Sequence, residues 1–174
     1  MTGSINKTDI VAARNQHNRT AGKLFEEMLD AACDYYSLTG DAEIEKTPEP
    51  RKVVGRTGGR KSMMICINEK KAQPEYKGTL LGGRSVVFEA KHTDTEKMEQ
   101  SRVSDEQARC LDRHERLGAL CFVVVSFSHE KFFRVPWGDW KCMKKMYGRK
   151  YIKADDLTGS ELNISNGFLE FLEF

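Results

Sequence analysis

The feature that most constrains this fold is an almost continuous apolar run, Ala119–Phe127, between Gly118 and the polar pair Ser128-His129. The run is far shorter than the roughly 20 residues that a membrane-spanning helix needs. It also lacks the polar/apolar alternation of a strand with one face in water. Such runs are typical of a central strand that is covered on both faces. We therefore predict a sheet with this segment at its centre and helices packed against it.

Further elements can be placed on both sides of that strand from apolar periodicity, capping residues and turn residues. Polar residues from His92 to Arg102 are expected to form a loop. The predicted order is a helix from Asn18 or Thr20 to Tyr36, strands at 43–46 and 62–68, a hairpin of 73–81 and 84–91 across Gly82-Gly83, a helix from Ser104 to about Gly118, a strand at 131–135, and a helix from Pro136 toward Tyr147. This order indicates an α/β fold.

Length and composition indicate one domain. The chain has 174 residues, of which 39% are hydrophobic and 31% charged, as expected for a globular protein with a real core. We detect no signal peptide, membrane span, repeat or second domain, so a cytosolic location is expected. The five cysteines have no CxxC spacing and are interpreted as reduced, packed thiols rather than a zinc site: Cys33, Cys66, Cys110, Cys121 and Cys142.

The chemistry is concentrated in Phe88-Glu89-Ala90-Lys91, at the end of an apolar strand. Residues two apart on a strand point to the same face, so the heads of Glu89 and Lys91 should converge. A second carboxylate, Glu75, stands before the hairpin. Carboxylates suit Mg²⁺, and an ammonium group suits a phosphate oxygen or an attacking water. The group predicts metal-dependent hydrolysis of phosphodiesters, although a Glu-x-Lys pair alone can also be a solvated ion pair.

Basic residues are concentrated between Arg51 and Lys77, although the net charge is only +2. A basic stripe beside candidate metal ligands is the pattern expected for binding a phosphate backbone, and a solvated surface is the alternative. The segment Gly55–Ser62 resembles a phosphate-binding loop but lacks the GxxxxGK[ST] spacing, so nucleotide binding is rejected and a flexible basic loop is predicted.

The remaining candidates carry weaker signals. The four histidines have no ligand spacing: His17, His92, His114 and His129. Only His92, next to Lys91, could assist the site, and we expect it at the surface. Trp137 and Trp140 could stack on bases, but three residues apart on a helix they are more typical of a core.

In their shared order, these motifs resemble the RecU family of Holliday junction resolvases, from Gram-positive bacteria and their phages, within the PD-(D/E)XK nuclease superfamily. The resemblance covers about Asn18 to Leu157. It rests on Gly22-x-x-Phe25-Glu26, Lys46-Thr47-Pro48-x-Pro50, the basic insertion, Glu75-Tyr76-x-Gly78, Phe88-Glu89-Ala90-Lys91, Glu106-Gln107 and the apolar strand from Gly118 to Phe127.

The resemblance implies a restriction-endonuclease-like mixed central sheet flanked by helices, with a projecting basic stalk. It implies a single nuclease domain over residues 1–174, with a flexible segment at 1–17 and the stalk at 51–72. The activity it implies is paired, Mg²⁺-dependent nicking of a four-way junction by a homodimer in recombination and repair. Mn²⁺ can substitute for Mg²⁺, and host or phage recombination proteins are candidate partners at the nucleoid.

Site residues are carried over position by position. Glu75, Glu89, Lys91 and Gln107 correspond to the catalytic group; Glu75, Glu89 and Glu26 correspond to the metal ligands. Gln107 could instead be only the capping partner of Ser104. DNA contacts are expected from the stalk residues Arg51, Lys52, Arg56, Arg60, Lys61, Lys70 and Lys71.

This chain departs from the family pattern at two points. It has Glu75 where the family usually has aspartate, and Ala72-Gln73-Pro74 where hydroxyl-bearing residues usually precede that acid. Two other functions therefore stay open. One is a nuclease of the same fold that cuts ordinary duplex DNA, and the other is a non-catalytic protein that binds branched DNA.

Overall fold

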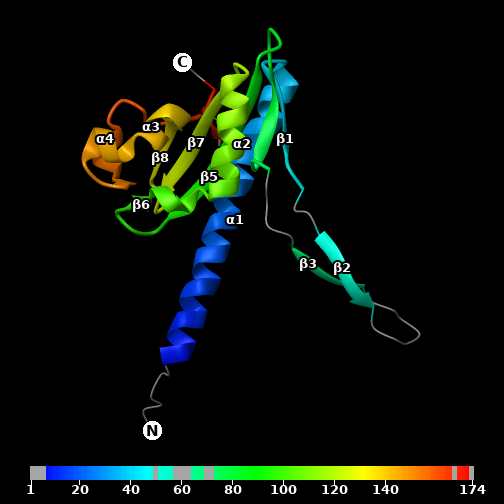
Figure 1. Cartoon of the computed structure of the whole chain (residues 1–174), viewed down its shortest axis with the longest axis vertical. Coiled ribbons are helices and arrows are strands. Elements are labelled where there is room, and N and C mark those ends of the chain that lie inside the picture. Colours follow the sequence, from blue (N-terminus) through cyan, green and yellow to red (C-terminus); the bar gives the residue numbers. More distant parts are fainter. Residues whose placement is uncertain (1–6, 49–50, 57–63, 69–72, 166–167, 173–174) are drawn as a thin grey trace.

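A mixed five-stranded sheet of order β1-β4-β5-β7-β8 forms the centre of the molecule in the computed structural model (Figure 1). The structure describes residues 7–48, 51–56, 64–68, 73–165 and 168–172. Strands β5 and β7 are parallel, and the other neighbours in this sheet are antiparallel. The strands are β1 (Ala42–Lys46), β4 (Tyr76–Leu80), β5 (Ser85–Thr93), β7 (Leu120–Phe127) and β8 (Lys131–Pro136).

The predicted central strand is confirmed as β7, in which every residue from Cys121 to Phe127 is buried. It pairs with β5 on one side and β8 on the other. A parallel neighbour requires a crossover connection, and helix α2 (Asp105–Arg116) supplies it between β5 and β7. The α/β prediction and the mixed, helix-flanked sheet are thus confirmed at this level.

Two hydrophobic cores lie on the two faces of the sheet. On the face covered by α1, three aromatic rings from neighbouring strands stack in a row: Tyr76 on Phe88 at 4.7 Å and Phe88 on Phe122 at 4.8 Å between centroids. The opposite core, beneath α2 and α3, contains Trp137 and Trp140, both almost fully buried. The core interpretation of the two tryptophans is therefore confirmed.

The first helix, α1 (Lys7–Thr39), is longer than predicted, and its first turns extend beyond the sheet (Figure 1). It ends at Thr39, three residues beyond the predicted end at Tyr36, and is followed by Gly40, whose φ of 78° favours glycine. Residues 1–6 lie outside the described chain, and the predicted flexibility of 1–17 stays a prediction.

The predicted helix after Pro136 is instead two short helices, α3 (Trp137–Lys141) and α4 (Met143–Tyr147). They are divided at Cys142, whose backbone N–H is shared between the carbonyls of Gly138 and Asp139.

Strands β2 (Arg51–Arg56) and β3 (Met64–Asn68) form a separate antiparallel pair, with an irregularity between Val53 and Gly55. This ribbon stands apart from the central sheet in Figure 1. Only β3 was expected from the sequence. Residues 57–63 and 69–72 of the predicted stalk lie outside the described residues.

Short elements complete the chain. The segment predicted as a loop at 92–102 contains the end of β5, strand β6 (Met98–Glu99) and the 3₁₀ helix η1 (Gln100–Arg102). No helix in the described part of the chain is long and apolar enough to cross a membrane. The C-terminal part contributes β9 (Tyr151–Ile152), η2 (Ala154–Leu157), β10 (Ile164–Ser165) and β11 (Phe168–Leu169).

Three of the predicted packed thiols are confirmed, and the prediction is wrong for Cys142. Cys33, Cys110 and Cys121 are buried and free, whereas Cys142 is free and exposed. Burial, the largest effect, raises the pKa of Cys33 and of Cys121 to about 12. Both thiols therefore stay protonated at neutral pH, as expected of inert core cysteines.

Candidate functional site

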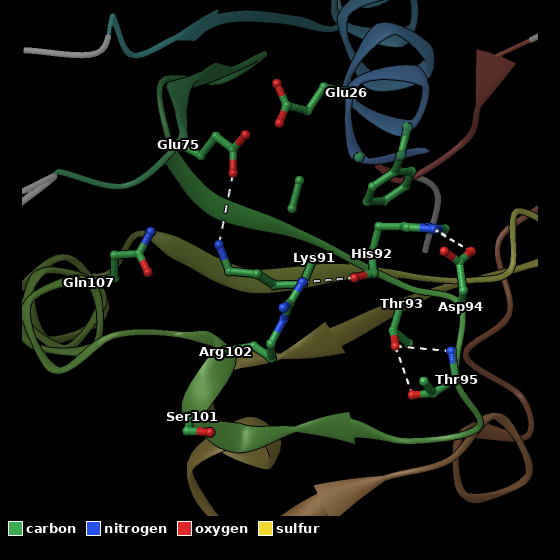
Figure 2. A pocket seen from close by; sticks show the side chains of 13 residues that line it. Glu26, Glu75, Lys91, His92, Thr93, Asp94, Thr95, Ser101, Arg102 and Gln107 are labelled. Atoms are coloured by element: carbon green, nitrogen blue, oxygen red, sulfur yellow. Dashed lines mark hydrogen bonds and ion pairs between the residues drawn. The ribbon is translucent and has the colours of Figure 1, made fainter. Parts of the chain in front are cut away.

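A pocket of about 930 Å³ lies where α1, the start of β4, the end of β5, η1 and α2 meet (Figure 2). Its polar lining combines carboxylates, two cations, hydroxyl groups and an amide: Glu26, Glu75, Lys91, His92, Thr93, Asp94, Thr95, Ser101, Arg102 and Gln107. Four of the predicted catalytic and metal-binding residues line this pocket, namely Glu26, Glu75, Lys91 and Gln107, and the fifth, Glu89, is buried behind it.

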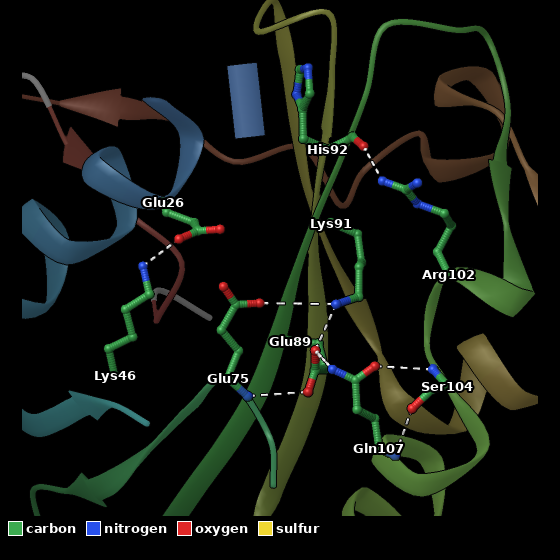
Figure 3. A network of polar contacts seen from close by, with 9 residues as sticks. All are labelled: Glu26, Lys46, Glu75, Glu89, Lys91, His92, Arg102, Ser104 and Gln107. Carbon is green, nitrogen blue, oxygen red and sulfur yellow. Dashed lines mark hydrogen bonds and ion pairs between the residues drawn. The ribbon is translucent and has the colours of Figure 1, made fainter. Parts of the chain in front are cut away.

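Glu89 does not line the pocket and has no exposed surface, but it contacts three residues that do: Glu75, Lys91 and Gln107. Its Oε1 accepts the backbone N–H of Glu75 at 3.1 Å. Its Oε2 accepts Lys91 Nζ at 2.7 Å and Gln107 Nε2 at 2.6 Å. A buried carboxylate needs hydrogen-bond partners, and here the residue before β4, strand β5 and helix α2 supply them (Figure 3).

Lys91 lies between the two acids of the predicted catalytic group. Besides its bond to Glu89, its Nζ is 4.0 Å from Glu75 Oε2, and both of these side chains are mostly shielded from solvent. Strand geometry explains the Glu89–Lys91 pairing, since residues two apart share a face of β5. The bond is partly buried, so the alternative of a solvated ion pair does not describe it.

Gln107 is the capping partner of Ser104 and also contacts Glu89, whereas its catalytic role stays a prediction. Its Oε1 accepts the backbone N–H of Ser104 at 3.0 Å, and Ser104 Oγ accepts the backbone N–H of Gln107 at 3.2 Å. This is the reciprocal capping box at the start of α2. The amide Nε2 then points inward to Glu89, so the helix cap fixes the orientation of a site residue.

Glu26 lines the same pocket but is paired elsewhere. Lys46 Nζ donates to Glu26 Oε2 at 2.5 Å and lies 3.7 Å from Asp30 Oδ2. Partial burial opposes the charge of Lys46, but the bond to Glu26 and the charges of Glu26, Asp30 and Glu75 outweigh it and raise the pKa of Lys46. Lys46 is therefore a charged neighbour that ties Glu26 of α1 to β1.

Tyr76 links this pair to the sheet. Its hydroxyl donates to Asp30 Oδ1 at 2.7 Å, and burial followed by this hydrogen bond raises the pKa of Tyr76. The phenol is thus neutral and serves as a fixed donor from β4 to α1.

Two carboxylates of this site, those of Glu75 and Glu89, could serve as ligands of a divalent metal. Within the described residues, no three Asp, Glu, His or Cys side chains are grouped closely enough to hold one ion. Glu75 and Glu89 nevertheless converge on one partly buried ammonium group, that of Lys91. Mg²⁺ is commonly held by one or two carboxylates with water and phosphate oxygens as further ligands. The donors fit such an ion, and a metal role for Glu26 stays a prediction.

His92 was predicted at the surface, and this prediction is wrong. The side chain is buried, with Nδ1 3.0 Å from Ser126 Oγ and Nε2 2.9 Å from Asp94 Oδ1, and its ring stacks on His129. The reason is that β5 continues to Thr93, so His92 faces α1 like Phe88 and Ala90. If the predicted strand had been extended from residue 91 to residue 93, its alternation would have placed His92 on the buried face.

The predicted DNA-binding residues are only partly described. Arg51, Lys52 and Arg56 lie on β2. Arg60, Lys61, Lys70 and Lys71 lie outside the described residues. One pocket cation, Arg102, was missed from the sequence because its neighbourhood was interpreted as a loop.

Comparison with known proteins agrees with the family resemblance seen in the sequence. The sequence profile of the RecU family, described as Recombination protein U, matches residues 20–174. The Holliday junction resolvase RecU of Bacillus pumilus is 28% identical over 144 residues, which are 78% of this chain and 69% of that protein. The protein of the same name from Bacillus licheniformis is 26% identical over 160 residues, 88% of this chain and 80% of that protein.

Among solved structures, the Holliday junction resolvase Hjc of Archaeoglobus fulgidus aligns with a TM-score of 0.46 and 13% identity. The alignment covers 78% of this chain and 90% of that one.

Proposed function

This chain belongs to the RecU family, and from that membership we propose that it is a metal-dependent endonuclease that resolves four-way (Holliday) DNA junctions. The observation that carries the proposal is the buried group of Glu75, Glu89, Lys91 and Gln107 at an open pocket. It combines anionic oxygens for a metal with a cation for a phosphate. Its relatives from Bacillus pumilus and Bacillus licheniformis carry the name Holliday junction resolvase.

In the proposed site, Glu75 and Glu89 would hold Mg²⁺, with Mn²⁺ as a substitute. When bound, the ion lowers the pKa of a water molecule and neutralises charge on the phosphoryl oxygens. Gln107 and the Glu75 backbone N–H each donate to one oxygen of Glu89 and thereby fix the orientation of its carboxylate. Lys91 would orient the attacking water and stabilise the charge that develops on the phosphate.

Pairing of cuts would come from a homodimer. A four-way junction is two-fold symmetric, and a C2 dimer presents one site to each of two strands. The basic segment 51–72 would then contact the centre of the junction, where phosphates are crowded and positive charge contributes most.

The deciding experiment compares a synthetic four-way junction with linear duplex of the same arms, in Mg²⁺ and in EDTA. We expect symmetric nicks in the junction with Mg²⁺, none in EDTA, and much slower cutting of duplex. Lys91→Ala is the matched inactive control, since it should bind the junction but not nick it. Equal cutting of duplex would favour a general nuclease, and binding without cutting by the parent would favour a non-catalytic protein.

The stalk and the dimer are tested separately. Removing residues 55–61 should lower affinity for the junction and flatten its salt dependence, while binding to duplex changes less and the dimer persists. Equal losses on both substrates would reduce the segment to a general phosphate-binding patch. A monomer in light scattering at micromolar concentration would argue against paired nicking.

A further inference from the structure

We propose that Arg102 binds a phosphate of the DNA strand next to the one that is cut, and so positions that strand in the pocket. The inference rests on the proposed function and adds a DNA contact from the body of the enzyme, apart from the basic segment 51–72. Arg102 is the last residue of η1 and lines the same pocket as Glu75 and Lys91.

The guanidinium of Arg102 is fixed beside the catalytic group. Its Nη2 donates to the backbone carbonyl of His92 at 2.9 Å. His92 directly follows Lys91 on β5, so this bond ties the tip of Arg102 to the strand that carries the chemistry (Figures 2 and 3). A guanidinium has five N–H donors in a rigid plane, and the bond to His92 uses only one nitrogen.

Charge distinguishes Arg102 from the other cation of the pocket. Lys91 is committed to Glu89 and Glu75. No carboxylate among the described residues forms an ion pair with Arg102, which is exposed. The nearby acids have other partners, since Glu26 pairs with Lys46 and Asp94 with His92. Arg102 therefore has charge and donors available for an anion from outside the chain.

A phosphodiester matches these properties. It carries one negative charge and two non-bridging oxygens, which a guanidinium can bind in a bidentate manner. The metal-binding acids and Lys91 would engage the phosphate that is cut, so the anion left for Arg102 is a neighbouring phosphate of the same strand. Ser101, also in the pocket lining, offers a hydroxyl donor beside it.

The simpler explanation is that Arg102 only straps η1 to β5 through the His92 carbonyl. The two roles predict different measurements. A strap contributes to stability, whereas a phosphate contact also contributes to the salt dependence of DNA binding, by about 0.9 in the slope of log K against log salt for each phosphate neutralised.

The test uses the full chain and junction DNA in EDTA, so that binding is measured without cutting. Arg102→Gln should weaken binding about tenfold and lower the salt slope by about 0.9 per arginine lost. Arg102→Lys, which keeps the charge, should retain the slope with a smaller loss of affinity. Arg113→Gln removes an equally exposed arginine of α2 that does not line the pocket, and it should leave binding unchanged.

Methylphosphonate substitution, which removes the charge of single phosphates, supplies the second measurement. A neutral group next to the cut site should weaken the parent, and this loss should shrink in Arg102→Gln, or in Arg102→Met if Arg102→Gln proves too unstable to assay. A parent-like affinity and slope in the charge-removing variant, or equal methylphosphonate losses in the parent and that variant, would overturn the inference. Those results leave junction cutting by the parent intact, whereas a parent that neither binds nor cuts the junction would refute the proposed function itself.

Discussion

Gln107 offers the sharpest test of how the fold builds the site, because one side chain closes a helix cap and orients Glu89. Gln107→Leu removes both contacts at similar volume. The lost charge-assisted bond to Glu89, 2.6 Å long, is worth about 1.5–3 kcal/mol. Loss of the acceptor for the Ser104 N–H adds about 0.5–1 kcal/mol. The expected destabilisation is therefore about 2–4 kcal/mol, or a fall in Tm of about 4–16 °C.

Ser104→Ala is the matched control. It removes the hydroxyl that accepts the Gln107 N–H at 3.2 Å but leaves the Glu89 bond in place. It should cost about 1 kcal/mol and retain nicking, whereas Gln107→Leu should slow nicking strongly even at temperatures where it is fully folded. Thermal melts and single-turnover nicking of the junction measure the two effects. If both variants lose the same stability and both keep parental nicking rates, Gln107 is a cap residue only and the reasoning fails.

Three further predictions address the metal acid, the buried phenol and the sheet. Glu75→Gln should abolish nicking and Glu75→Asp should keep or raise it, so an active Glu75→Gln protein would make that carboxylate a bystander. The raised pKa of Tyr76, from burial and then Asp30, means that the unfolded chain releases a proton above pH of about 10 while the folded chain keeps it. Stability should thus be complete below pH 10 and fall above it, less steeply in Tyr76→Phe in denaturant titrations. Gly78→Ala would place Cβ 2.1 Å from the carbonyl oxygen of Glu43, so the Tm should fall. A Tm equal to that of the parent would show that β1 can move away without loss of stability.

The sequence was informative where the signal is local. Apolar runs and period-two alternation placed β7 and the shared face of Glu89 and Lys91, because strand geometry alone determines them. The spacing of Ser104 and Gln107 likewise predicts a capping box. The partner of the Gln107 amide could not be predicted, since Glu89 is 18 residues away and meets it only through the packing of α2 on β5.

Long-range partners account for the other misses. No local pattern pairs Lys46 with Glu26, which lies 20 residues earlier on α1. The C-terminal strands β9, β10 and β11 have two residues each, too few for any periodicity to register. His92 was predicted at the surface because the strand was ended two residues too early. An error of this size is enough to assign a buried side chain to the solvent.

The connection between the basic segment and the site emerges only from the three-dimensional structure. Strand β1 ends at Lys46 and β4 begins at Tyr76, and these two residues are paired neighbours in the sheet. Thr47 N–H donates to the Glu75 carbonyl at 2.8 Å, and Glu75 N–H donates to Glu89 Oε1 at 3.1 Å. The backbone of Glu75, which follows the insertion, is therefore held on one side by Thr47, which precedes the insertion, and on the other by the buried acid Glu89. These two backbone hydrogen bonds fix the position of Glu75 where the chain returns from the insertion to the pocket.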